Sequence, residues 1–127
     1  MKVGILGGGQ LARMLVEAGT PLGLDFTIVD PKADACAAGM GRFIHADYTD
    51  PDALDCLAAC DRVTCDFENV PADALAVIDD RVAVRPSAAA LAAAQDRLSE
   101  KDRFTRLGME TPGYAEVNSR TDLQAAV

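Results

Sequence analysis

Three consecutive glycines, Gly7 to Gly9, are the residues whose pattern most clearly indicates chemistry. They follow a short apolar run, residues 3–6, which predicts a buried strand. Beyond them, apolar side chains recur at helical spacing, at Leu11, Met14, Leu15 and Ala18. Glycine permits the tight turn between a strand and a helix, and the first amides of a helix have no partner within it. Because the helix dipole favours negative charge there, the segment predicts an anion site.

A second candidate site is the acidic pair Asp66 and Glu68, which flanks Phe67 after a predicted strand at 62–65. Two carboxylates this close can converge on one ligand, and each oxygen accepts hydrogen bonds, so the pair suits the hydroxyls of a sugar. The alternative is that both side chains are simply solvated at the end of a strand.

A third candidate is Arg97, which follows Gln95 and Asp96 at the predicted start of a charged helix. A guanidinium group can donate two parallel hydrogen bonds to a phosphate. The alternative is a surface charge that pairs with a neighbouring carboxylate.

Short strands alternate with helices through the first two thirds of the chain, which predicts an α/β fold with a parallel sheet covered on both faces. The sequence predicts further strands at 24–29, 42–45 and 82–84, with helices beginning near Asp50 and Pro71. Sites in such sheets lie at the carboxyl ends of the strands, where both the glycine turn and the acidic pair fall.

The pattern changes at Ser87, so we expect one domain over residues 1–86 and a second segment over 87–127. The second segment predicts an alanine-rich helix, a charged helix ending near Leu107, a strand at 114–117 and a helix capped by Ser119. Because that last helix has barely begun at Val127, we expect the chain to be the N-terminal piece of a longer protein.

The formal net charge of −8 argues against a nucleic-acid or acidic-membrane surface. No apolar run is long enough to cross a bilayer, and a cytoplasmic protein is expected. The four cysteines match no zinc-binding pair, and we expect them to be buried as small hydrophobic side chains.

Gly7, Gly9 and Ala12 also fit the dinucleotide fingerprint G-x-G-x-x-G/A, and Asp30 stands at about the spacing of a ribose ligand. The chain could therefore be an NAD(P)-binding Rossmann domain of a dehydrogenase. A third possibility is a binding module without catalytic activity.

Four segments, taken in order, resemble the N-terminal part of the 5-(carboxyamino)imidazole ribonucleotide synthases, ATP-grasp carboxylases of purine biosynthesis. They are GGGQLARM at 7–14, TCDFENV at 64–70, QDRLSEK at 95–101 and LGMETP at 107–112. The resemblance implies a Rossmann-like pre-ATP-grasp domain followed by the truncated start of an ATP-grasp domain. It also implies a ligase that converts 5-aminoimidazole ribonucleotide, bicarbonate and ATP into the carboxyamino product, ADP and phosphate.

The resemblance implies roles for individual residues. Gly8, Gly9, Gln10 and Leu11 would hold the 5′-phosphate of the ribonucleotide. Asp66 and Glu68 would take the ribose hydroxyls, although family members usually carry glutamate at both positions, which leaves open which of the two makes the contact. Arg97 would contact ATP. Magnesium and the catalytic groups would lie outside this chain, and the complete enzyme would be a homodimer.

Overall fold

The computed structural model describes residues 1–127. It contains four strands: β1 (Lys2–Leu6), β2 (Asp25–Asp30), β3 (Arg42–His45) and β4 (Arg62–Cys65). The α-helices are α1 (Gln10–Gly19), α2 (Pro51–Ala58), α3 (Ala72–Asp79), α4 (Ala88–Gln95), α5 (Arg97–Arg106) and α6 (Arg120–Ala126), and a short 3₁₀ helix, η1, spans Thr20–Leu22. None of the helices is long and apolar enough to cross a membrane.

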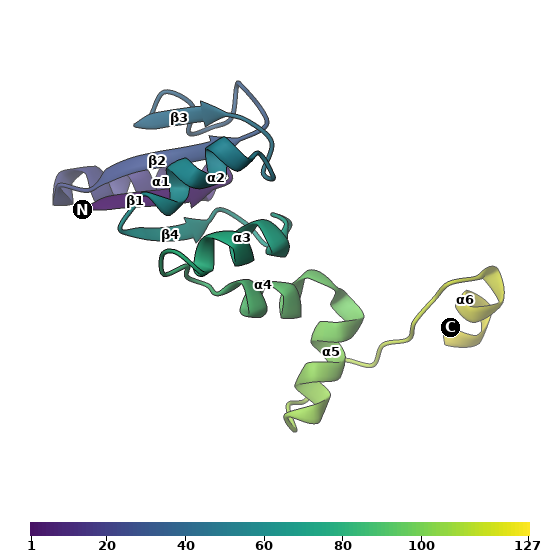
Figure 1. Ribbon diagram of the computed structural model, residues 1–127. Helices are drawn as coiled ribbons and strands as arrows, with labels where there is room; N and C mark the ends of the chain where they lie inside the picture. Colours follow the sequence, from purple (N-terminus) through teal and green to yellow (C-terminus); the bar gives the residue numbers. More distant parts are fainter. The chain divides into compact units, whose positions relative to one another are not determined.

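The four strands form one parallel sheet in the order β3-β2-β1-β4, with β1 and β2 in the centre (Figure 1). Because side chains alternate along a strand, the sheet contributes apolar side chains to two hydrophobic cores, one on each of its faces. Leu6, Val29 and Val63 face α2 and α3 and belong to the larger core. Ile5 and Ile28 face the other side, where they pack with Val16 of α1. The expected parallel sheet with helices on both faces is confirmed.

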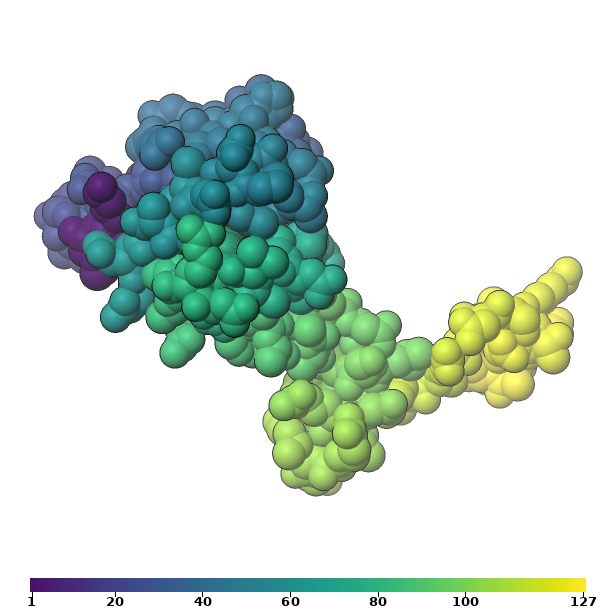
Figure 2. Space-filling view, viewed as in Figure 1, coloured from purple at the N-terminus to yellow at the C-terminus, as the bar shows by residue number.

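Helices α2 and α3 lie next to each other over the same face of the sheet, and their teal and green atoms adjoin in the space-filling view (Figure 2). The N-terminus of α2 is fixed as its sequence predicts, because the Asp50 carboxylate accepts the N–H of Ala53 at 2.8 Å and Pro51 opens the helix.

Two predicted strands are absent. The segment at 82–84 forms a single bridge, between Val63 and Val84, rather than a fifth strand. The bridge consists of two hydrogen bonds, both made by Val63: its N–H donates to the Ala83 carbonyl at 3.2 Å, and its carbonyl accepts the N–H of Arg85 at 2.9 Å. The segment at 114–117 has no regular structure and no strand beside it, although its residue types favour extended backbone.

Contacts within the chain divide it into two units, residues 1–92 and residues 93–127. The first unit holds the sheet and both cores. In the second, α5 is capped by Asp96, whose carboxylate accepts the N–H of Ser99 at 2.8 Å, and α6 is capped by Ser119. The division between functional domains at residues 86 and 87 stays a prediction.

Candidate functional site

The glycine turn joins the end of β1 to the start of α1 at the carboxyl edge of the sheet. Gly7 adopts a φ of 100°, which side chains rarely allow, and its amide donates to the carbonyl of Val29 at 2.8 Å. Gly9 is the N-cap of α1 and has no side chain to bond the first amides of the helix. The turn and the helix N-terminus are therefore arranged as the sequence predicts.

The amides of this turn are less open than the sequence suggests, because the carboxylate of Asp66 occupies two of them. Its Oδ1 accepts the N–H of Ala12 at 2.5 Å, and its Oδ2 accepts the N–H of Gly9 at 3.1 Å. The side chain is only 8% exposed. Asp66 thus caps α1 from the end of a different strand, a role that the sequence pattern does not reveal.

This close approach also explains two of the glycines. A Cβ atom on Gly7 would lie 2.7 Å from the Cβ of Asp66, and one on Gly9 would overlap the Asp66 carboxylate. The glycines are thus needed to admit a carboxylate of the same chain, quite apart from any bound ligand.

Asp30 holds the turn from the other side. Its Oδ2 accepts the N–H of Gly8 at 2.7 Å and the hydroxyl of Tyr48 at 3.1 Å, while its Oδ1 accepts the N–H of Lys32 at 2.8 Å. Asp30 is 6% exposed. Burial, together with the hydrogen bond to Asp30, raises the pKa of the Tyr48 hydroxyl well above its ordinary value.

Two amides of the turn remain available to a ligand. The N–H groups of Gln10 and Leu11, in the first turn of α1, have no acceptor within the chain, and both residues are exposed. Free amides at a helix N-terminus attract an anion through both hydrogen bonding and the helix dipole. Of the four residues predicted to hold a phosphate, Gln10 and Leu11 thus keep free donors, whereas the amides of Gly8 and Gly9 are engaged.

A cavity of about 530 Å³ lies beside the turn and collects residues from the carboxyl ends of the strands. Its lining includes Gly8, Gly9, Asp30, Lys32, Asp34, Tyr48, Asp66 and Phe67. Tyr48 and Phe67 form an edge-to-face pair with their ring centroids 6.5 Å apart. Phe67 belongs to the acidic segment that the sequence singles out, but the sequence interpretation missed Tyr48; its position shortly after β3 is the signal that would have found it.

Glu68 lies in an exposed segment two residues beyond Asp66. Since both oxygens of Asp66 bond the turn, the two carboxylates differ in role: one is buried in an intramolecular cap and the other is at the surface. Arg97, in the second unit, is the first residue of α5 and forms an ion pair with Glu100. No group of three or more potential metal ligands is present in residues 1–127.

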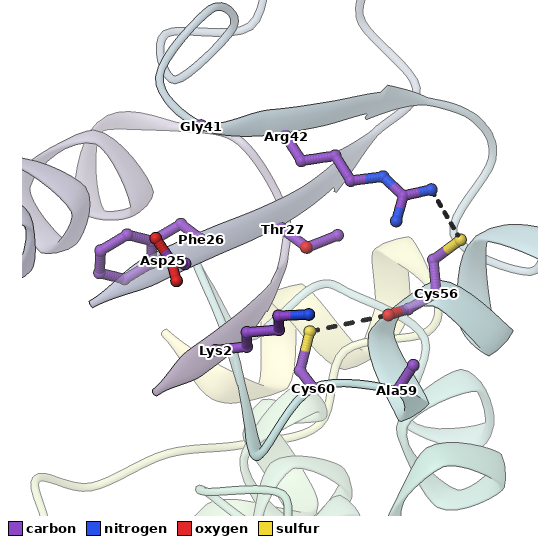
Figure 3. A pocket seen from close by; sticks show the side chains of 9 residues that line it. All are labelled: Lys2, Asp25, Phe26, Thr27, Gly41, Arg42, Cys56, Ala59 and Cys60. Carbon is purple, nitrogen blue, oxygen red and sulfur yellow. Dashed lines mark hydrogen bonds between the residues drawn. The ribbon is translucent and has the colours of Figure 1, made fainter. Parts of the chain in front are cut away.

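A second cavity, of about 350 Å³, lies at the opposite edge of the sheet (Figure 3). Lys2 and Arg42 extend there toward Cys60 and Cys56, and the Arg42 guanidinium donates to the Cys56 sulfur at 3.4 Å. Both cations lie beside the C-terminal end of α2, where the helix dipole favours positive charge, so a structural role explains them. The expectation of four buried thiols was wrong: Cys60 is buried, which raises its pKa, whereas Cys36 is exposed and Cys56 and Cys65 are half-buried.

Comparison with known proteins decides between the possible families. Residues 1–95 match the family model of the ribonucleotide synthetase preATP-grasp domain. The chain belongs to this family. It is 51% identical to the N5-carboxyaminoimidazole ribonucleotide synthase of Pseudomonas aeruginosa over 99% of its own length and 35% of that protein. The preATP-grasp chain thus corresponds to the N-terminal portion of these synthases and spans about a third of their length.

Solved structures agree with this assignment. The preATP-grasp chain superimposes on N5-carboxyaminoimidazole ribonucleotide synthetase from Thermus thermophilus with a TM-score of 0.87 and 45% identity, over 97% of this chain and 34% of that one. A synthase from Aspergillus clavatus, 30% identical, has been solved in complex with ADP and 5-aminoimidazole ribonucleotide, and matches with a TM-score of 0.79 over 98% of this chain and 35% of that one. The dehydrogenase interpretation is not supported, because Asp30 is turned inward onto Gly8.

Proposed function

We propose that this chain is the ribonucleotide-binding part of an enzyme that carboxylates 5-aminoimidazole ribonucleotide with ATP and bicarbonate. The observation that carries the proposal is the similarity over the whole chain to N5-carboxyaminoimidazole ribonucleotide synthases, one of which was solved with ADP and this ribonucleotide. The site adds support, since a helix N-terminus with free amides stands next to an acidic segment at the same sheet edge.

In the proposed complex, the 5′-phosphate accepts hydrogen bonds from the amides of Gln10 and Leu11. Two charge-assisted bonds of this kind, together with the dipole of the ten-residue α1, fix one end of the nucleotide. The turn does not have to reorganise, because Asp30 and Asp66 already hold it in place.

The ribose hydroxyls would donate to the carboxylate of Glu68. Asp66 is the weaker candidate for this contact, since its oxygens already accept the amides of Gly9 and Ala12. Held at its phosphate and its sugar, the nucleotide would present its exocyclic amine to the carboxyl donor. Positioning of this kind is a major part of catalysis when two substrates must meet.

The chemical step would take place outside this chain. ATP would phosphorylate bicarbonate to carboxyphosphate and leave as ADP, and the amine would then capture the carboxyl group with release of inorganic phosphate. Arg97 would contact ATP, magnesium would be held by residues beyond Val127, and the complete enzyme would be a cytoplasmic homodimer. The share of the relatives' length that lies outside this chain, about two thirds, is the support for placing these groups there.

The test is calorimetric titration of the chain with 5-aminoimidazole ribonucleotide and with the corresponding nucleoside, which lacks the phosphate. We expect the nucleotide to bind more tightly by about tenfold or more, since two charge-assisted bonds are lost with the phosphate. Equal affinity for the two compounds would show that the helix N-terminus does not hold the phosphate, and absence of binding by both would contradict the proposal.

A further inference from the structure

The glycine turn differs from a dinucleotide-binding site in the groups that accept hydrogen bonds from its backbone amides. In the dinucleotide-binding fold, such amides and the helix N-terminus face a pyrophosphate. Here the amides of Gly8, Gly9 and Ala12 already donate to carboxylates of the chain itself, at 2.7, 3.1 and 2.5 Å. Only the amides of Gln10 and Leu11 stay free.

The two carboxylates that occupy these amides are also buried, since Asp30 is 6% and Asp66 is 8% exposed. Both line the cavity that a second phosphate would have to enter. Charges of one sign repel more strongly where solvent screening is weak. A pyrophosphate in the turn would therefore find these amide donors already occupied and would be repelled by two negatively charged carboxylates.

In dinucleotide enzymes an acidic residue at the end of the second strand binds a ribose. Asp30 occupies the same place, at the end of β2, but its oxygens bond groups of the chain itself. Its two oxygens accept the amides of Gly8 and Lys32 and the hydroxyl of Tyr48. The same side chain thus closes both the pyrophosphate position and the adjoining ribose position.

We propose that Asp30 and Asp66 form a selectivity pair that closes this glycine turn to pyrophosphate-containing ligands and leaves room for one phosphate monoester at Gln10 and Leu11. The monoester half of this inference rests on the proposed function. The exclusion of pyrophosphates does not, because it follows from hydrogen bonds within the chain.

The test compares inorganic pyrophosphate binding by the chain, by the Asp66→Ala variant and by the Asp34→Ala variant. Asp66→Ala releases the amides of Gly9 and Ala12. Asp34→Ala is the matched control, because Asp34 lines the same cavity, is exposed and bonds no amide of the turn. It therefore removes the same charge without releasing a donor.

We expect Asp66→Ala to bind pyrophosphate at least about tenfold more tightly than the unchanged chain in calorimetry, and Asp34→Ala to differ by less than about twofold. An equal gain in both variants would overturn the inference, because general charge would then explain the effect. Pyrophosphate binding that is as tight in the unchanged chain as in Asp66→Ala would also overturn it.

A second measurement keeps the inference testable if Asp66→Ala does not fold. In amide NMR spectra of the unchanged chain, pyrophosphate should leave the signals of Gly8, Gly9 and Ala12 in place, since these amides stay bonded to Asp30 and Asp66. Saturable shifts at these three amides would contradict the inference. The proposed function would fail separately, through absence of binding by 5-aminoimidazole ribonucleotide.

Discussion

At the scale of single residues, the close contact between Gly9 and Asp66 determines the form of the site. The sequence interpretation left open whether Asp66 or Glu68 contacts a sugar. In the structure the Asp66 carboxylate accepts amides of the glycine turn, because the end of β4 lies beside the turn after β1. The sequence shows that both segments follow strands. It cannot show that a side chain after one strand reaches the amides after another, since that depends on register and twist.

Replacement of Gly9 by alanine should destabilise the chain by about 1–3 kcal/mol, because the new methyl group overlaps the Asp66 carboxylate. The φ of Gly9, −78°, is ordinary, so the effect is steric rather than conformational. Urea unfolding measures this change in the free energy of unfolding.

Gly113→Ala is the control, since a Cβ there meets nothing within 4 Å, and it should change stability by less than about 0.5 kcal/mol. The cost of Gly9→Ala should shrink when Asp66→Ala is already present; equal costs in both backgrounds would contradict this account.

Glu68→Ala should weaken binding of 5-aminoimidazole ribonucleotide, since each charge-assisted hydrogen bond to a sugar hydroxyl contributes about 1.5–3 kcal/mol. Calorimetry on the chain measures the loss. Glu110→Ala, which removes another exposed glutamate, serves as the control and should leave the affinity unchanged. Unchanged affinity in Glu68→Ala would mean that Glu68 does not contact the nucleotide.

At the scale of the elements, the helix caps and the four strands of the sheet follow from the sequence, while pairing at the sheet edge does not. The N-caps at Asp50 and Ser119 were both predicted from residue type and spacing and are both present. The segment expected as a strand at 82–84 pairs with β4 only through the two hydrogen bonds that Val63 makes, to Ala83 and Arg85. Local signals therefore predict where elements lie, whereas the length of a pairing at the sheet edge depends on how distant segments meet in the fold.

The cap of α5 gives a pH prediction. Hydrogen bonds from Ser99 lower the pKa of the Asp96 carboxyl below its ordinary value. A carboxyl group whose pKa is lower in the folded state stabilises the folded state at pH values above its pKa in the unfolded chain. This stabilisation disappears as the pH falls through the pKa of the folded state. We expect NMR titration to show that the pKa of Asp96 lies below the ordinary value of an aspartate, with the Ser99 amide signal following the same curve. A titration midpoint at or above that value would contradict the cap.

At the scale of the whole molecule, the chain carries the preATP-grasp fold of its family and spans about a third of the relatives' length. The ordered motifs predicted this family correctly, because four segments with their spacing are far more specific than one glycine turn. The sequence left open which residues of the site keep free hydrogen-bond donors and which residues support the turn. The structure places the free amides at Gln10 and Leu11, with Asp30 and Asp66 as supports.

The chain alone should release no phosphate from ATP in the presence of magnesium, since the proposed transfer groups correspond to the part of the relatives that this chain does not cover. A phosphate-release assay checks this, with the complete synthase of a relative as the positive control. Turnover by the purified chain that survives a further purification step would contradict the proposed division of the enzyme.

The most direct test of the central claim is an amide NMR titration of the chain with 5-aminoimidazole ribonucleotide. The claim predicts saturable shifts at Gln10, Leu11 and Glu68, while Gly8 and Gly9 keep the signals of amides bonded to Asp30 and Asp66. Shifts centred on the cavity of Lys2 and Arg42, with the start of α1 unchanged, would contradict it.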